Sequence, residues 1–179
     1  MPTRLQTNTA KTNLQRERIA LELKGYLERA RFDSVKRDAL NAAEMANVTL
    51  TGSTSYTFQT DTNQNRTLEA SEVSSVSFAG YNSGAFVGSL VYPLKISFDQ
   101  QGHVLINNSQ INTTQTFKIC TSDCVNESSA NTIIVTLSPA GTAAIKAGGT
   151  VITEPTAPTV TNVDPNTGLR SMTLVNSNL

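Results

Sequence analysis

The chain changes character near residue 46. Residues 9–46 contain no proline and a single glycine, and the sequence predicts one long, charged helix across them. From Asn47 onward, short Val, Ile, Thr and Ser segments alternate with Asn, Gly and Ser turns, a pattern typical of β-strands. At about 1.5 Å per residue, a helix of that length extends roughly 55 Å, which is more than a small β domain needs as a cover.

Length and charge set the limits for this organisation. A chain of 179 residues suffices for one domain, and an apolar content of 38% without tryptophan predicts a modest core. The net charge is zero, so bulk charge gives no reason to expect nucleic acid. Residues 1–46 hold nine Lys and Arg against six acidic residues, whereas the rest holds five against eight. This uneven distribution of charge is typical of a solvated helix face, and it could also matter for the stacking of like subunits.

The predicted helix has one apolar face. Its residues recur at spacings of three and four, which is the repeat of a helix buried along one side. They are Ile19, Leu23, Tyr26, Leu27 and Ala30. Opposite charges four residues apart support the exposed face: Arg18 with Glu22, Lys24 with Glu28, Arg29 with Asp33, and Asp33 with Arg37. The segment before Ile19 is almost entirely polar, as in a helix that projects beyond its domain.

The second part of the chain predicts an antiparallel sheet. Alternating apolar residues, such as Ile96 and Phe98, indicate strands with one buried face. Turns are expected at 99–102 and 138–141, and a tail at 151–179 is expected to be extended or disordered. The predicted strands span residues 48–51, 55–60, 73–79, 94–99, 104–107, 116–121 and 132–138, with a short element at 142–146. The fold class is therefore α+β: a helix over 1–46 packed on a small antiparallel β-sheet domain over 47–150.

The two cysteines, Cys120 and Cys124, are four residues apart in a turn-like Thr-Ser-Asp context. This spacing favours a small disulfide loop over two free thiols, and a disulfide would indicate an oxidising compartment. A metal site or a catalytic thiol would need further ligands or a base, and the only histidine is His103. The polar start contains no signal peptide and no transmembrane run. It predicts either a cytosolic protein or a chain without its targeting segment.

Several segments, in this order, resemble a known family. The stretch LERARFDSVKRDALNAAEMANVTL is similar to the helix-to-strand junction of type IV pilin-like proteins, in particular the FimT/GspH-type minor pilins and pseudopilins. The pattern runs through Ala30-Arg31, Ser34-Val35 and Arg37 into Val48-Thr49-Leu50, with Ser34 in the usual alanine position. FQTDTNQNRTLEASEV resembles the acidic loop of that family, LKISFDQQGHV its hairpin, and NTIIVTLSPAGTA its final strand and turn. The resemblance covers about residues 9–146.

This resemblance implies a pilin-like fold and a structural role. Members of the family prime, cap or join a type IV pilus or a type II secretion pseudopilus, and their partners are other pilin or pseudopilin subunits. They begin with a leader and an apolar half-helix that is held in the bacterial inner membrane, with the sheet domain in the periplasm or at the cell surface. The chain enters the family pattern after that segment, which implies a soluble fragment. Some members bind DNA during natural transformation.

The spacing of oxygen-bearing side chains between residues 61 and 72 predicts a metal site. Counting Asp61 as the first position, oxygen-bearing side chains follow at the third, fifth, ninth and twelfth positions: Asn63, Asn65, Glu69 and Glu72. This spacing matches a calcium-binding EF-hand loop, although Arg66 occupies the position where that loop needs glycine. A polar, solvent-exposed turn without metal has the same composition. Calcium is therefore a candidate ligand, and no other cofactor is expected.

No pattern indicates an enzyme. The chain contains no phosphate-binding loop and no zinc motif, and a catalytic triad cannot be built convincingly around a single histidine. The alternative to a structural subunit is a DNA-binding minor pilin of an uptake machine. DNA would then contact basic residues of the helix. These are Arg16, Arg18, Lys24, Arg29 and Arg31, which alternate with acidic residues.

Overall fold

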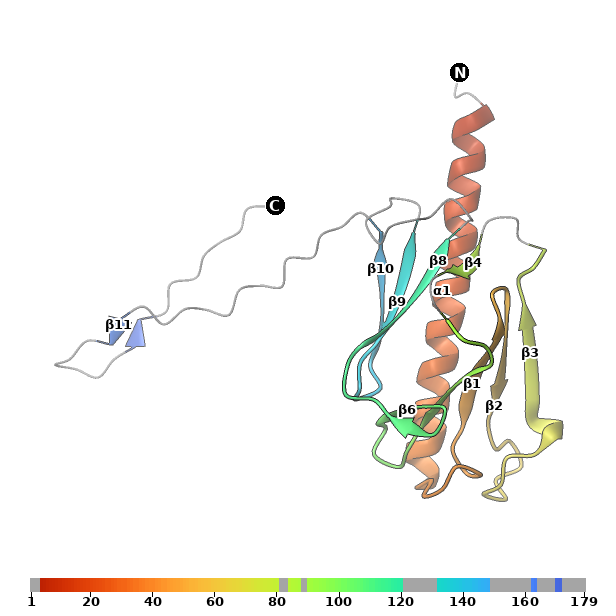
Figure 1. Cartoon of the computed structure of the whole chain (residues 1–179), viewed down its shortest axis with the longest axis vertical. Helices are drawn as coiled ribbons and strands as arrows, with labels where there is room; N and C mark the ends of the chain where they lie inside the picture. Colours follow the sequence, from red (N-terminus) through yellow and green to blue (C-terminus); the bar gives the residue numbers. More distant parts are fainter. Residues whose placement is uncertain are drawn as a thin grey trace.

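A computed structural model describes residues 4–80, 84–87, 90–120, 132–148, 162–163 and 170–171. A long helix, α1 (Arg4–Arg37), precedes all the strands and lies against two antiparallel sheets (Figure 1). The N-terminal end of α1 extends past the edges of both sheets. In the described part of the chain, more residues belong to β-strands than to the helix.

The helix ends at Arg37, nine residues before the predicted end at Ala46. Asp38 adopts a left-handed backbone conformation with φ of 56°. The N–H of Ala39 then donates to the carbonyl of Ser34 at 3.0 Å, and that of Asp38 to Val35 at 3.2 Å, which together form a Schellman cap. The segment that follows returns to the helix, because the N–H of Ala46 donates to Ser34 Oγ at 2.9 Å. The prediction missed this cap because helix propensity continues beyond Arg37.

The prediction of one small antiparallel sheet over 47–150 is wrong, because the strands between Asn47 and Ala147 form two sheets. The six-stranded sheet has the order β3-β2-β1-β5-β6-β7, and the four-stranded sheet has the order β10-β9-β8-β4. Alternation along the chain indicates where strands form, but it does not indicate which strands pair. Strands of the first sheet are β1 (Asn47–Gly52), β2 (Ser55–Gln59), β3 (Val73–Ser77), β5 (Leu94–Phe98), β6 (Val104–Ile106) and β7 (Ser109–Gln110).

The four-stranded sheet contains β4 (Ala85–Val87), β8 (Gln115–Cys120), β9 (Ile133–Leu137) and β10 (Ala143–Ala147). Two backbone hydrogen bonds join it to the first sheet: Phe86 N to Ser53 O at 2.7 Å and Val104 N to Pro139 O at 3.0 Å. A short 3₁₀ helix, η1 (Ala70–Glu72), precedes β3. Within 151–179, the described residues form β11 (Asn162–Val163) paired with β12 (Arg170–Ser171); the rest of the predicted tail lies outside the described residues.

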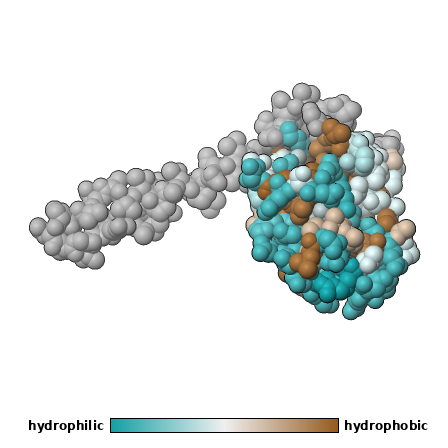
Figure 2. Space-filling model, turned by 60° about the horizontal axis from the view of Figure 1, so that its bottom comes forward, coloured by the Kyte–Doolittle hydropathy of each residue, from teal (hydrophilic) through white to brown (hydrophobic). Residues whose placement is uncertain are grey.

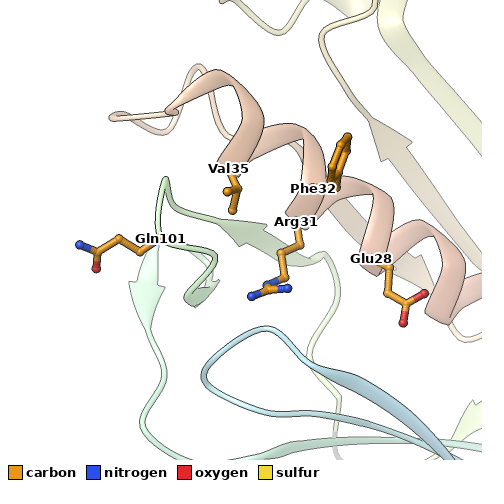
Figure 3. A pocket seen from close by; sticks show the side chains of 5 residues that line it. All are labelled: Glu28, Arg31, Phe32, Val35 and Gln101. Atoms are coloured by element: carbon orange, nitrogen blue, oxygen red, sulfur yellow. The ribbon is translucent and has the colours of Figure 1, made fainter.

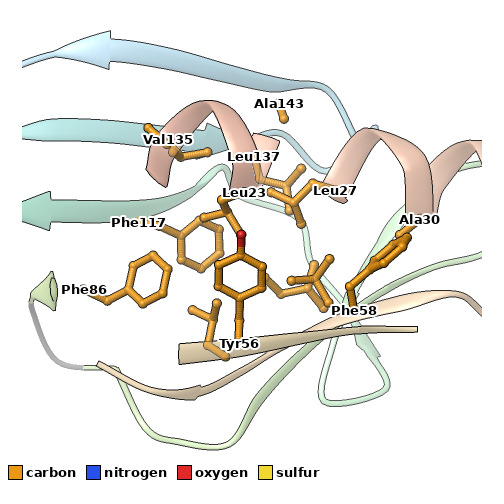
Figure 4. Packing of buried hydrophobic residues seen from close by; sticks show 14 of the residues in the cluster. Leu23, Leu27, Ala30, Tyr56, Phe58, Phe86, Phe117, Val135, Leu137 and Ala143 are labelled. Carbon is orange, nitrogen blue, oxygen red and sulfur yellow. The ribbon is translucent and has the colours of Figure 1, made fainter. Parts of the chain in front are cut away.

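The core lies where α1 crosses both sheets. Leu23, Leu27 and Ala30 of the helix are fully buried, and Figure 4 shows them against Tyr56 and Phe58 of the first sheet and Phe117, Val135 and Leu137 of the second. The Tyr56 hydroxyl is buried without a hydrogen-bond partner among the described residues. Burial, with smaller contributions from the charge of Glu22 and from Tyr26, raises the pKa of Tyr56 well above its ordinary value.

The predicted turns at 99–102 and 138–141 are both present. Gly102 N donates to Asp99 O and Gly141 N to Ser138 O, each at 2.9 Å, and both glycines have φ near 80°. A third turn was not predicted. Asn107 and Asn108 both have positive φ, and they connect β6 to β7 in the manner of a type I′ hairpin. Strand β4 also escaped prediction, because three residues are too few to show alternation.

Candidate functional site

The outer face of α1, opposite the sheets, carries exposed apolar residues in a row. Leu14 is 65% exposed, Leu21 62% and Phe32 69%. They are seven and eleven residues apart, which corresponds to about two and three turns at roughly 3.6 residues per turn, so they share one side of the helix. Gly25 lies on the same side, and nothing is within 4 Å of a Cβ placed on it. We call Leu14, Leu21, Gly25 and Phe32 the outer stripe.

Charged residues border the outer stripe differently on its two flanks. At 100° per residue, the basic flank is formed by Lys11, Arg18, Arg29 and Lys36, all exposed. The opposite flank carries Glu17 and Glu28, also exposed, and Lys24, which forms an ion pair with Glu28. The outer face of the helix is therefore an apolar row between a basic and a largely acidic edge. The predicted pair of Arg29 with Asp33 does not form; Arg29 instead lies over the Phe58 ring at 5.2 Å.

Arg31 extends from α1 between turns of the two sheets. Its Nε donates to the carbonyl of Gly102 at 3.4 Å. A Cβ at Gly102 would lie 2.7 Å from Arg31 Nε, and one at Gly141 would lie 2.6 Å from Arg31 Cδ. Both positions favour glycine because φ is positive at both, and a Cβ at Gly141 would also collide with the carbonyl oxygen of Gly102. Figure 3 shows Arg31 directed toward the β9–β10 turn, drawn in blue.

A pocket of about 450 Å³ lies beside Arg31. It is lined by Glu28, Arg31, Phe32 and Val35 of the helix and by Gln101 of the β5–β6 turn (Figure 3). Phe32 and Val35 are 69% and 42% exposed. Arg31 forms no ion pair with any residue in the described ranges. The pocket thus combines a cation, an amide and apolar surface.

Arg37 contrasts with Arg31, since acceptors surround its guanidinium. Nη2 donates to Asp33 Oδ2 at 2.6 Å and to the carbonyl of Glu44 at 2.7 Å, and Nη1 donates to Asp61 Oδ2 at 3.1 Å. The Asp61 side chain is fully buried. Its carboxylate also accepts the N–H groups of Asn65 and Arg66. This network fastens the loop after β2 to the end of the helix.

The loop predicted to bind calcium uses its carboxylates internally. Glu72 Oε1 accepts from the N–H of Thr62 at 2.7 Å and of Asn63 at 3.1 Å, and Oε2 accepts from Glu69 N at 3.0 Å. Burial alone would raise the pKa of Glu72, but these hydrogen bonds outweigh it and hold that pKa below its ordinary value.

The other oxygen-bearing side chains of the loop bond to one another rather than facing a common centre. Asn63 and Asn65 both donate to the Glu69 carboxylate. Among the described residues, no cluster of three or more His, Cys, Asp or Glu side chains is arranged to hold a metal ion. Calcium at this loop stays a prediction.

The remaining predicted residues occupy separate places. Ile19, Leu23, Leu27 and Ala30 are buried against the sheets, and Tyr26 is partly buried beside Tyr56 and Phe58. Cys120, at the end of β8, is disulfide-bonded, and Cys124 lies outside the described residues.

The five basic residues predicted for DNA binding do not form one surface. Arg16 is only 4% exposed, and burial lowers its pKa. Arg31 is half-buried between the turns, and Lys24 is paired with Glu28. Arg18 and Arg29 alone of the five lie on the basic flank, where Lys11 and Lys36 join them. Sequence reasoning missed these two lysines, although their distances from the apolar residues Leu14 and Phe32 could have placed them.

Two further findings bear on identity. No family model, curated protein or solved structure matches the chain. Within the described residues, no helix combines the length and apolar composition needed to cross a bilayer. On the face of the molecule seen in Figure 2, apolar residues form small separate patches in a largely hydrophilic surface.

Proposed function

We propose that this protein is a structural subunit, a minor pilin or pseudopilin, of a type IV pilus or a type II secretion pseudopilus. Its helix would pack on its own sheets with one face and on helices of neighbouring subunits with the other. The sequence resemblance of residues 9–146 supports the class of assembly, and the outer stripe supports the mode of packing. The role is structural and needs no catalysis.

The outer stripe is the observation that carries this proposal. A helix on the surface of a globular domain normally has one apolar face and a polar opposite face. Here Leu14, Leu21 and Phe32 lie opposite the buried residues and are more than 60% exposed. A second helix laid along this row would remove them from water, and Gly25 at its centre would permit close approach of the two backbones.

The charged flanks support packing between parallel helices. When two copies face each other in parallel, the basic flank of one meets the acidic flank of the other. Arg18 then lies opposite Glu17 of the neighbour, and Arg29 opposite Glu28. In an antiparallel pair the two basic flanks would meet and repel. The charged flanks would thus set the orientation and register of neighbouring subunits.

The resemblance also supports a location. In the full-length form, an apolar half-helix before the polar start would lie in the inner membrane. The sheets would then face the periplasm or the cell surface.

The proposal is tested in cells that produce the full-length protein. Leu21→Arg places a charge in the outer stripe, and Thr57→Arg, on the first sheet, is the matched control. We expect Leu21→Arg to remove the protein from sheared filament fractions or to abolish secretion, while the melting temperature of the purified domain stays unchanged. Normal assembly of Leu21→Arg would contradict the proposal.

The basic flank favours one second candidate, a DNA-binding minor pilin of an uptake machine. Lys11, Arg18, Arg29 and Lys36 form an exposed basic row along the helix. DNA binding through this row would weaken steeply with salt, because each contacted phosphate releases counterions. Arg18→Gln with Lys36→Gln should then lower DNA affinity and flatten the salt dependence, and unchanged DNA binding by this double variant would exclude this surface.

A further inference from the structure

Arg31 is held in place by the fold rather than by a counterion. Its aliphatic stem lies between Gly102 and Gly141, which belong to turns of different sheets. A Cβ at either glycine would lie within 2.7 Å of an Arg31 atom. The single hydrogen bond from Nε to Gly102 O uses one of the five N–H groups of the guanidinium. The side chain is therefore positioned in advance, and ordering it would cost little on binding.

The charge of Arg31 has no partner within the described part of the chain. No Asp or Glu lies within ion-pair distance of its guanidinium there. Glu28, the one acidic residue that lines the pocket, pairs with Lys24 instead. Arg37, six residues along the same helix, binds two carboxylates. The difference leaves a half-buried, preorganised cation beside a pocket of about 450 Å³.

We propose that this pocket binds the side-chain carboxylate of an Asp or Glu residue presented by another protein chain next to an apolar residue. The planar guanidinium matches a carboxylate in a two-pronged arrangement. Val35 and Phe32 supply exposed apolar surface for the neighbouring residue, and Gln101 borders the pocket from the β5–β6 turn. A phosphate fits less well, because its greater negative charge would lie beside Glu28. The proposal goes beyond the proposed function and concerns the unassembled protein, because Phe32 also belongs to the outer stripe.

The test uses capped peptides and nuclear magnetic resonance of the purified protein. Acetyl-Leu-Glu-Leu-amide carries one side-chain carboxylate, and acetyl-Leu-Gln-Leu-amide is its neutral match. The signals followed are the Arg31 Nε–H, the Gln101 side-chain amide and the Gly102 backbone amide. We expect the glutamate peptide to shift all three and to bind at least about tenfold more tightly than the glutamine peptide, as a charge-assisted contact predicts.

Variants and a third ligand complete the design. Arg31→Gln should abolish the preference for glutamate, whereas Arg18→Gln, on the other flank of the helix, should leave it unchanged. Should Arg31→Gln fail to fold, the comparison of the two peptides on the unaltered protein still decides. Equal binding of both peptides, or shifts that spare the Arg31 signal, would overturn the proposal. Tighter binding of N-acetylleucine would overturn it too, since the pocket would then select a chain terminus.

Discussion

The two faces of α1 differ in how far the rest of the chain buries their apolar residues. The inner face is completed within the chain: Leu23, Leu27 and Ala30 are fully buried by residues of both sheets. The outer face carries residues of similar type, yet Leu14, Leu21 and Phe32 remain largely exposed. The presence of leucine on both faces therefore does not imply equal roles. The inner face stabilises the domain, whereas the outer face has apolar surface to offer a partner.

Two arginines of the same helix repeat this contrast. Arg37 is enclosed by Asp33, Asp61 and the carbonyl of Glu44. Arg31 has one hydrogen bond, to Gly102, and borders a pocket. The first arginine holds a loop to the helix, and the second is positioned for a group that the described chain does not supply.

The largest expected effect comes from a leucine on each face. Leu27→Ala removes a fully buried side chain and should lower the free energy of unfolding by about 2–5 kcal/mol. Leu21→Ala, at 62% exposure, should change it by no more than about 0.5 kcal/mol. Urea denaturation of the purified domain measures both. Similar losses for the two variants would mean that the outer stripe already has a partner within the chain.

The second effect concerns the buried network at the end of α1. Asp61→Asn removes the charge opposite Arg37 Nη1 and weakens the acceptor of two backbone N–H groups. We expect a loss of about 2 kcal/mol, smaller than for a fully unpaired buried charge because Asp33 remains. Glu28→Gln is the control, since its ion pair is exposed and should contribute little. Equally small losses of unfolding free energy in the two variants would show that neither ion pair stabilises the fold.

The third prediction concerns acid. The pKa of Glu72 in the folded state lies below its value in the unfolded state. The ionised carboxylate therefore stabilises the fold at pH values above the ordinary pKa of Glu, which is about 4.3. This stabilisation is lost as the pH falls from that range through the folded pKa. Glu72→Gln should therefore flatten the acid limb of stability against pH, and the exposed Glu17→Gln should not. An unchanged acid limb for Glu72→Gln would mean that its hydrogen bonds contribute nothing to the fold.

The smallest effect is expected at the centre of the outer stripe. Gly25→Ala should stabilise the isolated domain by roughly 0.5–1 kcal/mol, because alanine favours the helix and nothing lies within 4 Å of the new Cβ. The melting temperature measures this gain. If the same variant also impairs assembly of the protein in cells, Gly25 serves close helix packing. A loss of stability would show that the outer face is covered at this position.

Local patterns in the sequence located most of the elements, but they missed strand β4, the end of the helix and the arrangement of the strands. The spacing of Ile19, Leu23 and Leu27 identified the buried face, and Gly102 and Gly141 marked the two turns. The helix end was missed because Asp38, unlike glycine, is an uncommon residue for a left-handed cap. The pairing of strands into two sheets depends on contacts between distant residues, so alternation could not reveal it.

The candidate site was predictable only in part. Exposed apolar residues at positions 14, 21 and 32 can be read from the spacing once the inner face is assigned. The pocket beside Arg31 could not be predicted, because it depends on turns of two sheets that meet only in the folded chain. The Arg37–Asp61 contact could not be predicted either, because it joins residues 24 positions apart that meet only in the folded chain.

Site-specific photo-crosslinking shows whether the outer stripe forms an interface between subunits. A benzophenone amino acid is placed at position 21 of the protein in its native cells, with position 57 on the sheet as the control. Mass spectrometry then identifies the joined residues. We predict adducts from position 21 to the helix of a neighbouring pilin or pseudopilin subunit, and none of these from position 57. Absence of such adducts from position 21 in assembling cells would contradict the account.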